Sequence, residues 1–574
     1  MVSIYSRIGP KILTTIGIDE RKKFLELHRH PIFLFGFIVR VFLIIFFIPN
    51  IHKHWFIPFM SHALSDFGID PWTTFIESGG SNLSFPYGVA MFTSYFPITW
   101  VSTLLDKLFS TNQIIFIGFK ITTLFFDYLS LITLALLIKN YSKSFLLITY
   151  WCSPLVIYIT YIHGQLDIIP ITFLLLSLLM VSWNKYRTSG LLLAIAISSK
   201  ISMIIALPLI FIFIYKRQYF NQPLFSFLKY FLFALIILYL PLFFSSGFNL
   251  MVMRTREIER IYSVYFSYGS TLKVYAIPII YTFSLYLVWR LKTVTKDLFV
   301  IATGISFLSL LIFLPPAPGW MLWAVPFISF YQIRAKKDFL LVWLIFNPIV
   351  IINSIIFTGD QNILLIFTSS SKILVDSWIL NNMDFKNLLF TSQQGLALLL
   401  AVRMYIFGLQ RNNFYKVSEE PYSIYLNGKN TNKYIDFAQS LEGLIGKNKI
   451  MFLKISEYTR SMKRSYILNK KSTFNNTIEL KSNLKKIESF HNSLNLNQRN
   501  SDPTILNYIK SALLSLNKKK PLYIVLLNDT KSSVLPFTLQ KRIDTNIIFE
   551  SDKDSIEKFF LNQINLSKPS LISY

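Results

Sequence analysis

The sequence has little cysteine and little negative charge. Its one cysteine, Cys152, excludes an internal disulfide and any metal cluster built from cysteines. Only 30 Asp and Glu residues oppose 57 Lys and Arg residues, so the formal net charge is +27. The first 30 residues contain no short apolar core that ends in small residues, so we expect no cleavable signal peptide. No internal repeat is evident.

Long apolar runs, in contrast, fill most of the chain. Hydrophobic residues make up 53% of the sequence, which includes 54 Phe, 30 Tyr and 10 Trp. A soluble domain cannot bury this much apolar surface, and many runs are long enough to cross a bilayer. Much of the basic excess lies in short loops between the runs, where it indicates membrane topology and attraction to anionic lipid. We therefore expect a polytopic α-helical membrane protein whose partners include membrane lipid and no nucleic acid.

The basic loops predict how the chain crosses the membrane, because Lys and Arg concentrate on the cytoplasmic side. Basic residues precede the first run, so residues 1–30 are expected in the cytoplasm and residues 50–86 outside. Crossings are predicted at residues 31–48, 113–138, 144–162, 167–183, 225–244, 265–289, 298–314, 321–331, 339–357 and 388–407. About 10–12 transmembrane segments result by the ~20-residue criterion, with both termini in the cytoplasm.

Two further apolar segments are irregular. Residues 85–105 are interrupted by Pro86 and Pro97, so we expect them to dip into the membrane or lie at its surface rather than cross. Residues 189–215 have basic residues at both ends and are interrupted at Ser198–Lys200. Two half-helices that enter from the cytoplasmic side explain this pattern, since irregular backbone is tolerated at membrane depth only where protein buries it. The alternative is a single tilted span with a shifted topology.

The composition changes near Gln410. Residues 411–574 contain no long apolar run, and strand-like pieces at 423–426, 523–527 and 546–549 alternate with turns and helix-like text. This alternation predicts a small cytoplasmic α/β domain with a partly parallel sheet.

Four polar clusters fall on the same predicted outer face, at residues 65–72, 163–167, 254–260 and 318–320. Ionisable groups near a membrane span are rare and usually functional, and the convergence matters more than any one cluster. Each cluster also has a purely structural interpretation. Asp66 and Asp70 suit a helix cap or a turn. Residues 163–167 suit capping and hydrogen bonds between spans, and the arginines at 254 and 256 suit a solvated loop.

Three motifs accompany these clusters: SFPYG at Ser84–Gly88, HGQLD at His163–Asp167 and PAPGWMLWAVPF at Pro316–Phe327. With an Asp in the first external loop, they resemble the polytopic glycosyltransferases of the GT-C fold, and most of all the bacterial polyprenyl-phosphate-mannose-dependent and related families. The resemblance covers residues 30–410. It implies a GT-C-like transmembrane domain at 31–410 in the bacterial inner (cytoplasmic) membrane, with a catalytic first external loop at 50–86.

The resemblance also implies a reaction. A mannose-like hexose moves from a polyprenyl-phosphate donor to a glycan or lipid-linked acceptor on the outer face, with inversion at the anomeric carbon. By position, the base that deprotonates the acceptor is Asp70 or Asp66, and Arg254 or Arg256 neutralises the departing phosphate. The remaining substrate-binding candidates are His163, Gln165 and Asp167, with Trp320 or Trp72 stacking on the sugar or lining the lipid path. The two aspartates lie four residues apart, whereas the family's acidic pair is often closer, so a divalent metal is left open as a cofactor and no metal ligand is assigned.

The tail resembles a degraded phosphate-binding loop followed by segments similar to the uridine kinase and phosphoribulokinase family. The pattern Gly-x4-Gly-Lys-Ser/Thr is occupied here by Asn427, Asn432, Lys433 and Tyr434. Only the lysine is retained, so Lys433 is a doubtful nucleotide-binding residue, and the resemblance implies a kinase-like domain that has lost catalysis. An unrelated basic α/β domain, or one that senses or scaffolds, is the alternative.

Two other functions compete with sugar transfer. A lipid-linked glycan flippase or transporter is typically marked by internal repeats and by intramembrane charge on several spans, and the sequence displays neither clearly. A polysaccharide polymerase or ligase shares the topology and has long external loops late in the chain, of which residues 358–387 are a modest example.

Overall fold

The computed structural model describes most of the N-terminal 410 residues and five strands beyond them. The described ranges are 26–66, 68–138, 142–217, 222–255, 259–269, 271–290, 296–314, 318–358, 362–365, 371–372, 382–410, 422–427, 450–457, 466–469, 523–528 and 545–548. The predicted site residues Arg256 and Lys433 therefore lie outside the described residues, as do residues 1–25 of the predicted N-terminal segment.

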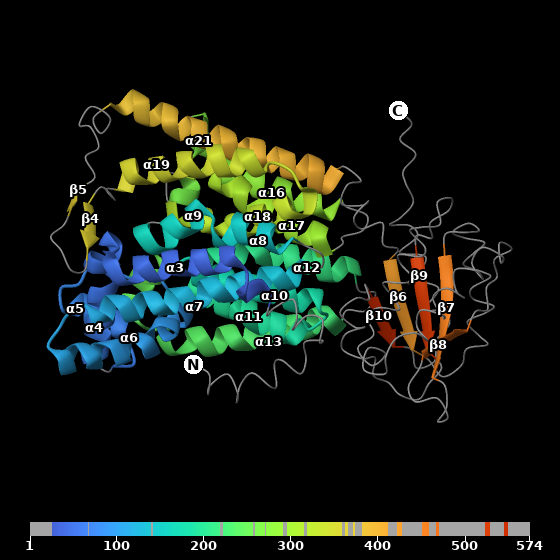
Figure 1. The fold of residues 1–574 in the computed structure, drawn as a ribbon, viewed down its shortest axis with the longest axis horizontal. Helices are drawn as coiled ribbons and strands as arrows, with labels where there is room; N and C mark the ends of the chain where they lie inside the picture. Colours follow the sequence, from blue (N-terminus) through green and yellow to red (C-terminus); the bar gives the residue numbers. More distant parts are fainter. Residues whose placement is uncertain are drawn as a thin grey trace.

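The first half of the large helical body is built from helices that pack side by side (Figure 1). Its elements are α3 (Pro31–Phe46), β1 (Phe47–Ile48), η1 (His52–Phe56), α4 (Ile57–Ser65), α5 (Pro71–Glu77), α6 (Val89–Phe109), α7 (Ile114–Leu137), α8 (Lys143–Leu146), η2 (Leu147–Trp151), α9 (Pro154–Ile157), η3 (Tyr158–His163), α10 (Ile168–Ser182), α11 (Tyr186–Ser199), η4 (Ile201–Ile205), α12 (Ala206–Arg217) and α13 (Gln222–Tyr239). Proline at the first position starts α3, α5 and α9, where its missing N–H costs nothing.

The second half adds further helices and two small strand pairings. Its elements are η5 (Leu240–Leu242), α14 (Ser246–Phe248), η6 (Asn249–Met253), η7 (Arg260–Tyr262), β2 (Tyr265–Tyr268), β3 (Leu272–Tyr275), α16 (Ala276–Trp289), α17 (Lys296–Leu311), η8 (Pro318–Trp323), α18 (Val325–Ala335), η9 (Leu341–Phe346), α19 (Asn347–Thr358), β4 (Asn362–Leu365), β5 (Ser371–Lys372), α21 (Met383–Met404) and η10 (Tyr405–Gln410). Strand β4 pairs antiparallel with both β1 and β5, and β2 pairs with β3.

Few of the described helices reach the length of a membrane span. Ile114–Leu137 and Pro223–Leu242 are long and apolar enough, and Lys143–Trp151 with Pro154–His163 makes a third if this pair, bent by 41°, is one span. Five shorter apolar helices accompany them, at Pro31–Phe46, Ile168–Ser182, Ile201–Tyr215, Ala276–Trp289 and Leu341–Phe357. The protein is thus mostly helical with two or three helices of spanning length, and the predicted 10–12 crossings stay a prediction.

Two sequence-based boundaries were wrong. Residues 89–109 form one continuous helix, α6, although Pro97 lies inside it. Pro86 precedes the helix. The predicted span at 265–289 instead begins with the β2–β3 hairpin, and only Ala276–Trp289 is helical. The second error arises because apolar content alone does not distinguish a helix from a short strand.

The interrupted segment at 189–215 forms the two predicted helices. Helix α11 ends at Ser199, Lys200 is extended with φ −150° and ψ 122°, and a 3-10 turn leads into α12. Lys200 therefore lies at the junction of two helices, where its side chain projects from irregular backbone. The backbone N–H of Gly88 donates to the carbonyl of Ser199 at 3.3 Å, which brings the start of α6 to this junction.

Helices α6 and α7 form an antiparallel hairpin that supports the site. The ring of Tyr95 stacks on Phe119 with centroids 4.0 Å apart. Asp106, at the end of α6, accepts hydrogen bonds from the backbone N–H groups of residues 113, 114 and 115 at 2.7–3.1 Å. This carboxylate therefore caps the N-terminus of α7, and it fixes the turn between the helices.

The five C-terminal strands form one sheet in the order β10-β6-β9-β7-β8. They are β6 (Tyr422–Asn427), β7 (Ile450–Glu457), β8 (Tyr466–Asn469), β9 (Tyr523–Asn528) and β10 (Thr545–Ile548). All neighbours are parallel except β7 and β8, so the predicted partly parallel sheet and its three predicted strands are confirmed. The chain leaves β6 toward β7 and leaves β9 toward β10, in opposite directions, which makes the carboxyl ends of β6 and β9 a topological switch point.

Candidate functional site

Asp167 is the centre of a buried polar cluster that joins several segments of the chain. Its side chain is fully buried and receives both contacts of the Lys200 ammonium, at 2.9 Å to each carboxylate oxygen. The indole N–H of Trp323 donates to Oδ2 at 2.8 Å, and the hydroxyl of Tyr87 donates to Oδ1 at 3.3 Å. One cation and two neutral donors thus satisfy a carboxylate that would otherwise be costly to bury.

The three motifs singled out in the sequence converge here. Gln165, from HGQLD, donates through Nε2 to the hydroxyl of Tyr87, from SFPYG, at 2.9 Å. A Cβ on Gly319, from the PGW element, would lie 2.1 Å from Cγ of Gln165, so only glycine allows this approach. The rings of Trp320 and Trp323 stack at 5.2 Å beside the cluster.

A second glycine sets the turn that carries Asp167. Gly164 has φ +85°, and a Cβ there would lie 2.4 Å from Cβ of Pro49. The imidazole Nε2 of His52 donates to the carbonyl of Gly164 at 2.7 Å. Burial, helped by the charge of Lys120, lowers the pKa of His52 to about 3, so this donor is a neutral imidazole.

Asp70 and Asp66, the two residues predicted as the base, lie in different environments. Asp70 is half-buried and caps α5, because its carboxylate accepts from the backbone N–H of Thr73 at 3.2 Å and from the Thr73 hydroxyl at 2.7 Å. Asp66 is exposed at the end of α4. Asp70 therefore fills the helix-capping role that its sequence context suggested, and it is partly exposed.

The Asp70 loop packs against the segment that leads to Arg254. The Thr73 hydroxyl lies 3.2 Å from the Ser245 hydroxyl and accepts from the backbone N–H of Gly247 at 2.9 Å. Arg254 follows this segment at the end of η6 and is exposed. Hydrogen bonds thus join α5, the helix that Asp70 caps, to the segment that leads into η6, and Arg254 lies at the end of η6.

Aromatic rings connect that pair of segments to the Asp167 cluster. Trp72 is 1% exposed, and its ring packs edge-on against Phe248 at 5.1 Å and lies 5.8 Å from Phe59. Phe59 stacks on Phe85 at 4.5 Å, and Phe85 lies two residues before Tyr87. Trp72 is therefore a core residue, and a ring this buried does not fit direct stacking on a sugar.

The remaining predicted residues lie at the edge of the cluster. His163 is 7% exposed and stacks on Tyr158 at 6.5 Å. Trp320 is 4% exposed, with the ammonium of Lys200 at 5.7 Å and the guanidinium of Arg260 at 5.5 Å from its ring centre. Trp320 thus lies between two cations, in a setting that strengthens cation–π attraction because it is desolvated.

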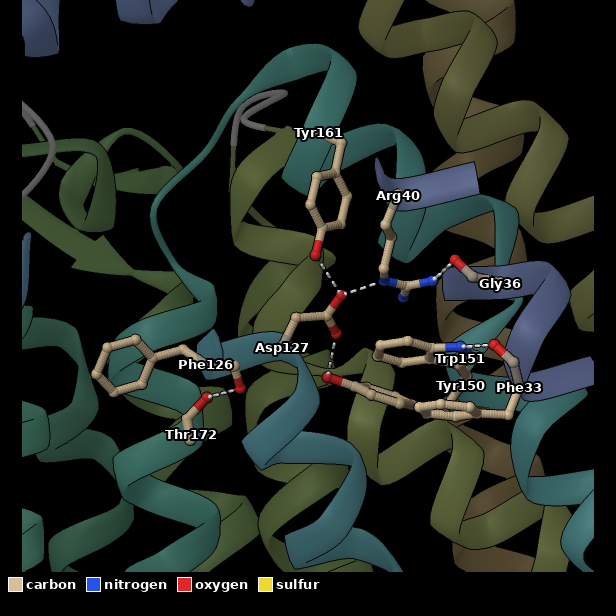
Figure 2. Close-up of polar contacts among 9 residues, drawn as sticks. All are labelled: Phe33, Gly36, Arg40, Phe126, Asp127, Tyr150, Trp151, Tyr161 and Thr172. Atoms are coloured by element: carbon tan, nitrogen blue, oxygen red, sulfur yellow. Dashed lines mark hydrogen bonds and ion pairs between the residues drawn. The ribbon is translucent and has the colours of Figure 1, made fainter. Parts of the chain in front are cut away.

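A second buried ion pair joins α3 to α7 (Figure 2). The guanidinium Nε of Arg40 donates to Oδ2 of Asp127 at 2.7 Å, and neither side chain is exposed. The hydroxyls of Tyr150 and Tyr161 donate to the same carboxylate at 3.2 and 2.9 Å. Arg40 also lies 3.7 Å from the ring centre of Trp151. Every charge here is paired, and the pair spans 87 positions of sequence.

A buried lysine on α7, Lys120, contacts the C-terminal end of α3. The ammonium of Lys120, on α7, donates to the carbonyls of Leu43 at 3.2 Å, Ile44 at 2.6 Å and Phe47. These carbonyls belong to the last turn of α3 and the residue after it, where a cation complements the helix dipole.

Sequence reasoning missed the partners of these acids. Lys200 was read only as an interruption between two helices, and the bonds of Tyr87 and Trp323 to Asp167 were not foreseen. Arg40, Lys120 and Asp127 were not singled out, although each lies inside an apolar run. An ionisable residue inside an apolar run was the available signal, since such residues pair inside the protein.

No metal-binding group of three or more His, Cys, Asp or Glu side chains occurs among the residues that the structure describes. No protein-family model matches this chain, and its sequence matches no curated protein.

Proposed function

We propose that this protein is a multi-pass membrane glycosyltransferase, which moves a hexose from a polyprenyl-phosphate donor to a glycan or lipid-linked acceptor at the outer face. The observation that supports it best is the convergence of the SFPYG, HGQLD and PGW segments on the Asp167–Lys200 pair. Side chains from three segments that lie far apart in sequence meet at this one buried acid.

In this proposal the buried cluster positions the segments and does not react. Asp167 has its oxygens occupied by Lys200, Trp323 and Tyr87, so it has little capacity left for a sugar hydroxyl. This revises the direct sugar-binding role expected for Asp167. The reacting groups are instead those at the accessible edge, Asp70 and Arg254.

The reaction needs a base and an anion-stabilising group. Asp70 takes the proton of the acceptor hydroxyl, the acceptor oxygen forms a bond to the anomeric carbon, and the bond from that carbon to the phosphate oxygen breaks. The lipid phosphate leaves with the electron pair, and Arg254 stabilises its added negative charge. Asp66 is exposed at the end of α4, and no hydrogen bond to its carboxylate occurs among the described residues, so it is the weaker candidate.

The test compares sugar transfer from a labelled polyprenyl-phosphate hexose in membranes that contain the wild type, Asp70→Asn or Asp66→Asn. Asparagine caps a helix about as well as aspartate, so Asp70→Asn keeps α5 and removes only the base. We expect transfer to fall at least 100-fold in Asp70→Asn and to stay unchanged in Asp66→Asn. Full activity in Asp70→Asn would exclude it as the base, and no turnover by the wild type with several lipid-linked hexoses would contradict the function.

A second candidate, transport of a lipid-linked glycan, is favoured by one observation. Buried charges occur on α3, α7 and the α11–α12 junction, at Arg40, Lys120, Asp127 and Lys200, whereas the sequence alone did not display them clearly. Such groups mark transport and proton pathways in many membrane proteins. Movement of a labelled lipid-linked glycan across vesicles that contain the purified protein, without any sugar transfer, would favour this candidate.

The tail is proposed to be a kinase-like domain without catalysis. The switch point at the carboxyl ends of β6 and β9 supports this, because ligands of open α/β sheets bind there and Lys433 follows β6 in sequence. Sugar transfer is expected to persist in Lys433→Ala.

A further inference from the structure

A pocket opens between the first external segment and the α6–α7 turn, away from the Asp167 cluster. Its volume is about 620 Å³, within the range of small-molecule sites. Polar groups from both sides line it, among them Ser61, Thr103 and Asn112, together with Lys53 from η1 and Lys107 from the last turn of α6.

The pocket has an excess of positive charge. Neither Lys53 nor Lys107 forms an ion pair within the described residues, and both are exposed. The acid in the lining, Asp106, has its carboxylate oxygens occupied by hydrogen bonds from the N-terminus of α7 and from the Thr111 hydroxyl at 2.6 Å. Two unpaired ammonium groups therefore face a pocket whose carboxylate is occupied, which favours an anionic ligand.

The surface beside the pocket is apolar. Val101, Leu104, Leu108 and Phe109 of α6 are 48%, 45%, 73% and 63% exposed, and their spacing places them along one side of the helix. The opposite side of α6, with Tyr95 and its neighbours, packs against α7. A soluble anion would leave this apolar strip uncovered, whereas the acyl chains of a lipid would cover it.

We propose that this pocket binds the phosphate head group of an anionic membrane lipid, whose acyl chains lie along the exposed side of α6. Lys53 and Lys107 neutralise the phosphate, and the hydroxyl of Ser61 and the amide of Asn112 supply hydrogen bonds. The site is separate from the proposed sugar-transfer site and does not depend on that activity.

The test measures phosphatidylglycerol binding to the purified full-length protein in neutral detergent, by native mass spectrometry. The key variant is Lys53→Gln with Lys107→Gln, and a charge-matched control is Lys273→Gln with Lys337→Gln, two exposed lysines elsewhere. A lysine near a lipid phosphate contributes about a fivefold affinity gain, so the key variant should bind the first lipid about 25-fold more weakly. The control should bind as the wild type does.

Two further variants separate charge from folding and lipid from soluble phosphate. Arginine at both lysine positions should retain binding, and Leu108→Gln should weaken it while the melting temperature stays unchanged. Wild-type affinity in the double glutamine variant, or an equal loss in the control pair, would overturn the proposal. Competition by glycerol 3-phosphate at the same concentration as the lipid would overturn its acyl-chain part.

Discussion

Removing the charge of Lys200 tests whether the Asp167 cluster holds the fold together. In Lys200→Met the side chain keeps a similar length and volume, but the carboxylate of Asp167 loses both contacts at 2.9 Å. Trp323 and Tyr87 remain as neutral donors, which cannot balance a full charge at a site with no solvent exposure.

The expected cost follows from that burial. Breaking a buried ion pair by removing one partner destabilises a protein by about 3–5 kcal/mol, because the other charge is left unpaired. The two neutral donors offset part of this, so we expect about 3 kcal/mol for Lys200→Met. The double variant Lys200→Met with Asp167→Leu replaces both partners and leaves no unpaired charge. Its loss of unfolding free energy should therefore be smaller than the summed losses of the two single variants, by at least about 2 kcal/mol.

The measurement is the free energy of unfolding of the full-length protein in mixed micelles, for the wild type, both single variants and the double variant. Lys273→Met, at an exposed position, controls for loss of a lysine and should change the free energy by less than about 0.5 kcal/mol. A cost below 1 kcal/mol for Lys200→Met, or strictly additive single changes, would show that the pair does not stabilise the cluster.

Three further predictions concern the segments around this pair. Gly164→Ala should lower the free energy of unfolding by at least about 1–2 kcal/mol, because its φ of +85° disfavours any side chain; thermal unfolding measures this, and an unchanged melting temperature would contradict it. Gly319→Ala should push Gln165 away, which reduces the rate of sugar transfer but changes the free energy of unfolding little. Both quantities are measured on one preparation. His52, neutral when folded with a pKa of about 3 against 6.5 when unfolded, contributes stability that is complete above pH 6.5 and is lost as the pH falls toward 3. Between pH 7.5 and 5.0 the wild type should therefore lose about 2 kcal/mol more than His52→Gln, in unfolding titrations at both pH values, and parallel losses would refute the assignment.

The sequence was informative where a local pattern determined the outcome. The interruption at Ser198–Lys200 predicted two helices, because a polar break in an apolar run has few other solutions, and α11 and α12 end and begin around it. The strand-like segments that alternate with helix-like segments in residues 411–574 correctly predicted a partly parallel sheet.

Partners far apart in sequence could not be predicted in the same way. Lys200 and Asp167 are 33 positions apart, and Arg40 and Asp127 are 87 apart, so no local pattern links them. The β2–β3 hairpin was missed for a different reason, since its Tyr and Phe residues were counted into the following span.

The buried charges themselves favour positioning over transport. A transport or proton pathway needs groups that can release their partners, but Asp127 accepts from Arg40, Tyr150 and Tyr161 at once, and all of these side chains are fully buried or nearly so. Tyr161 lies two residues before HGQLD, so the Arg40–Asp127 pair holds the helix from which the Asp167 turn emerges. Breaking that pair with Asp127→Asn should therefore reduce sugar transfer through displacement of the turn. Transfer that persists at the wild-type rate, together with a loss of glycan movement across vesicles, would instead support transport.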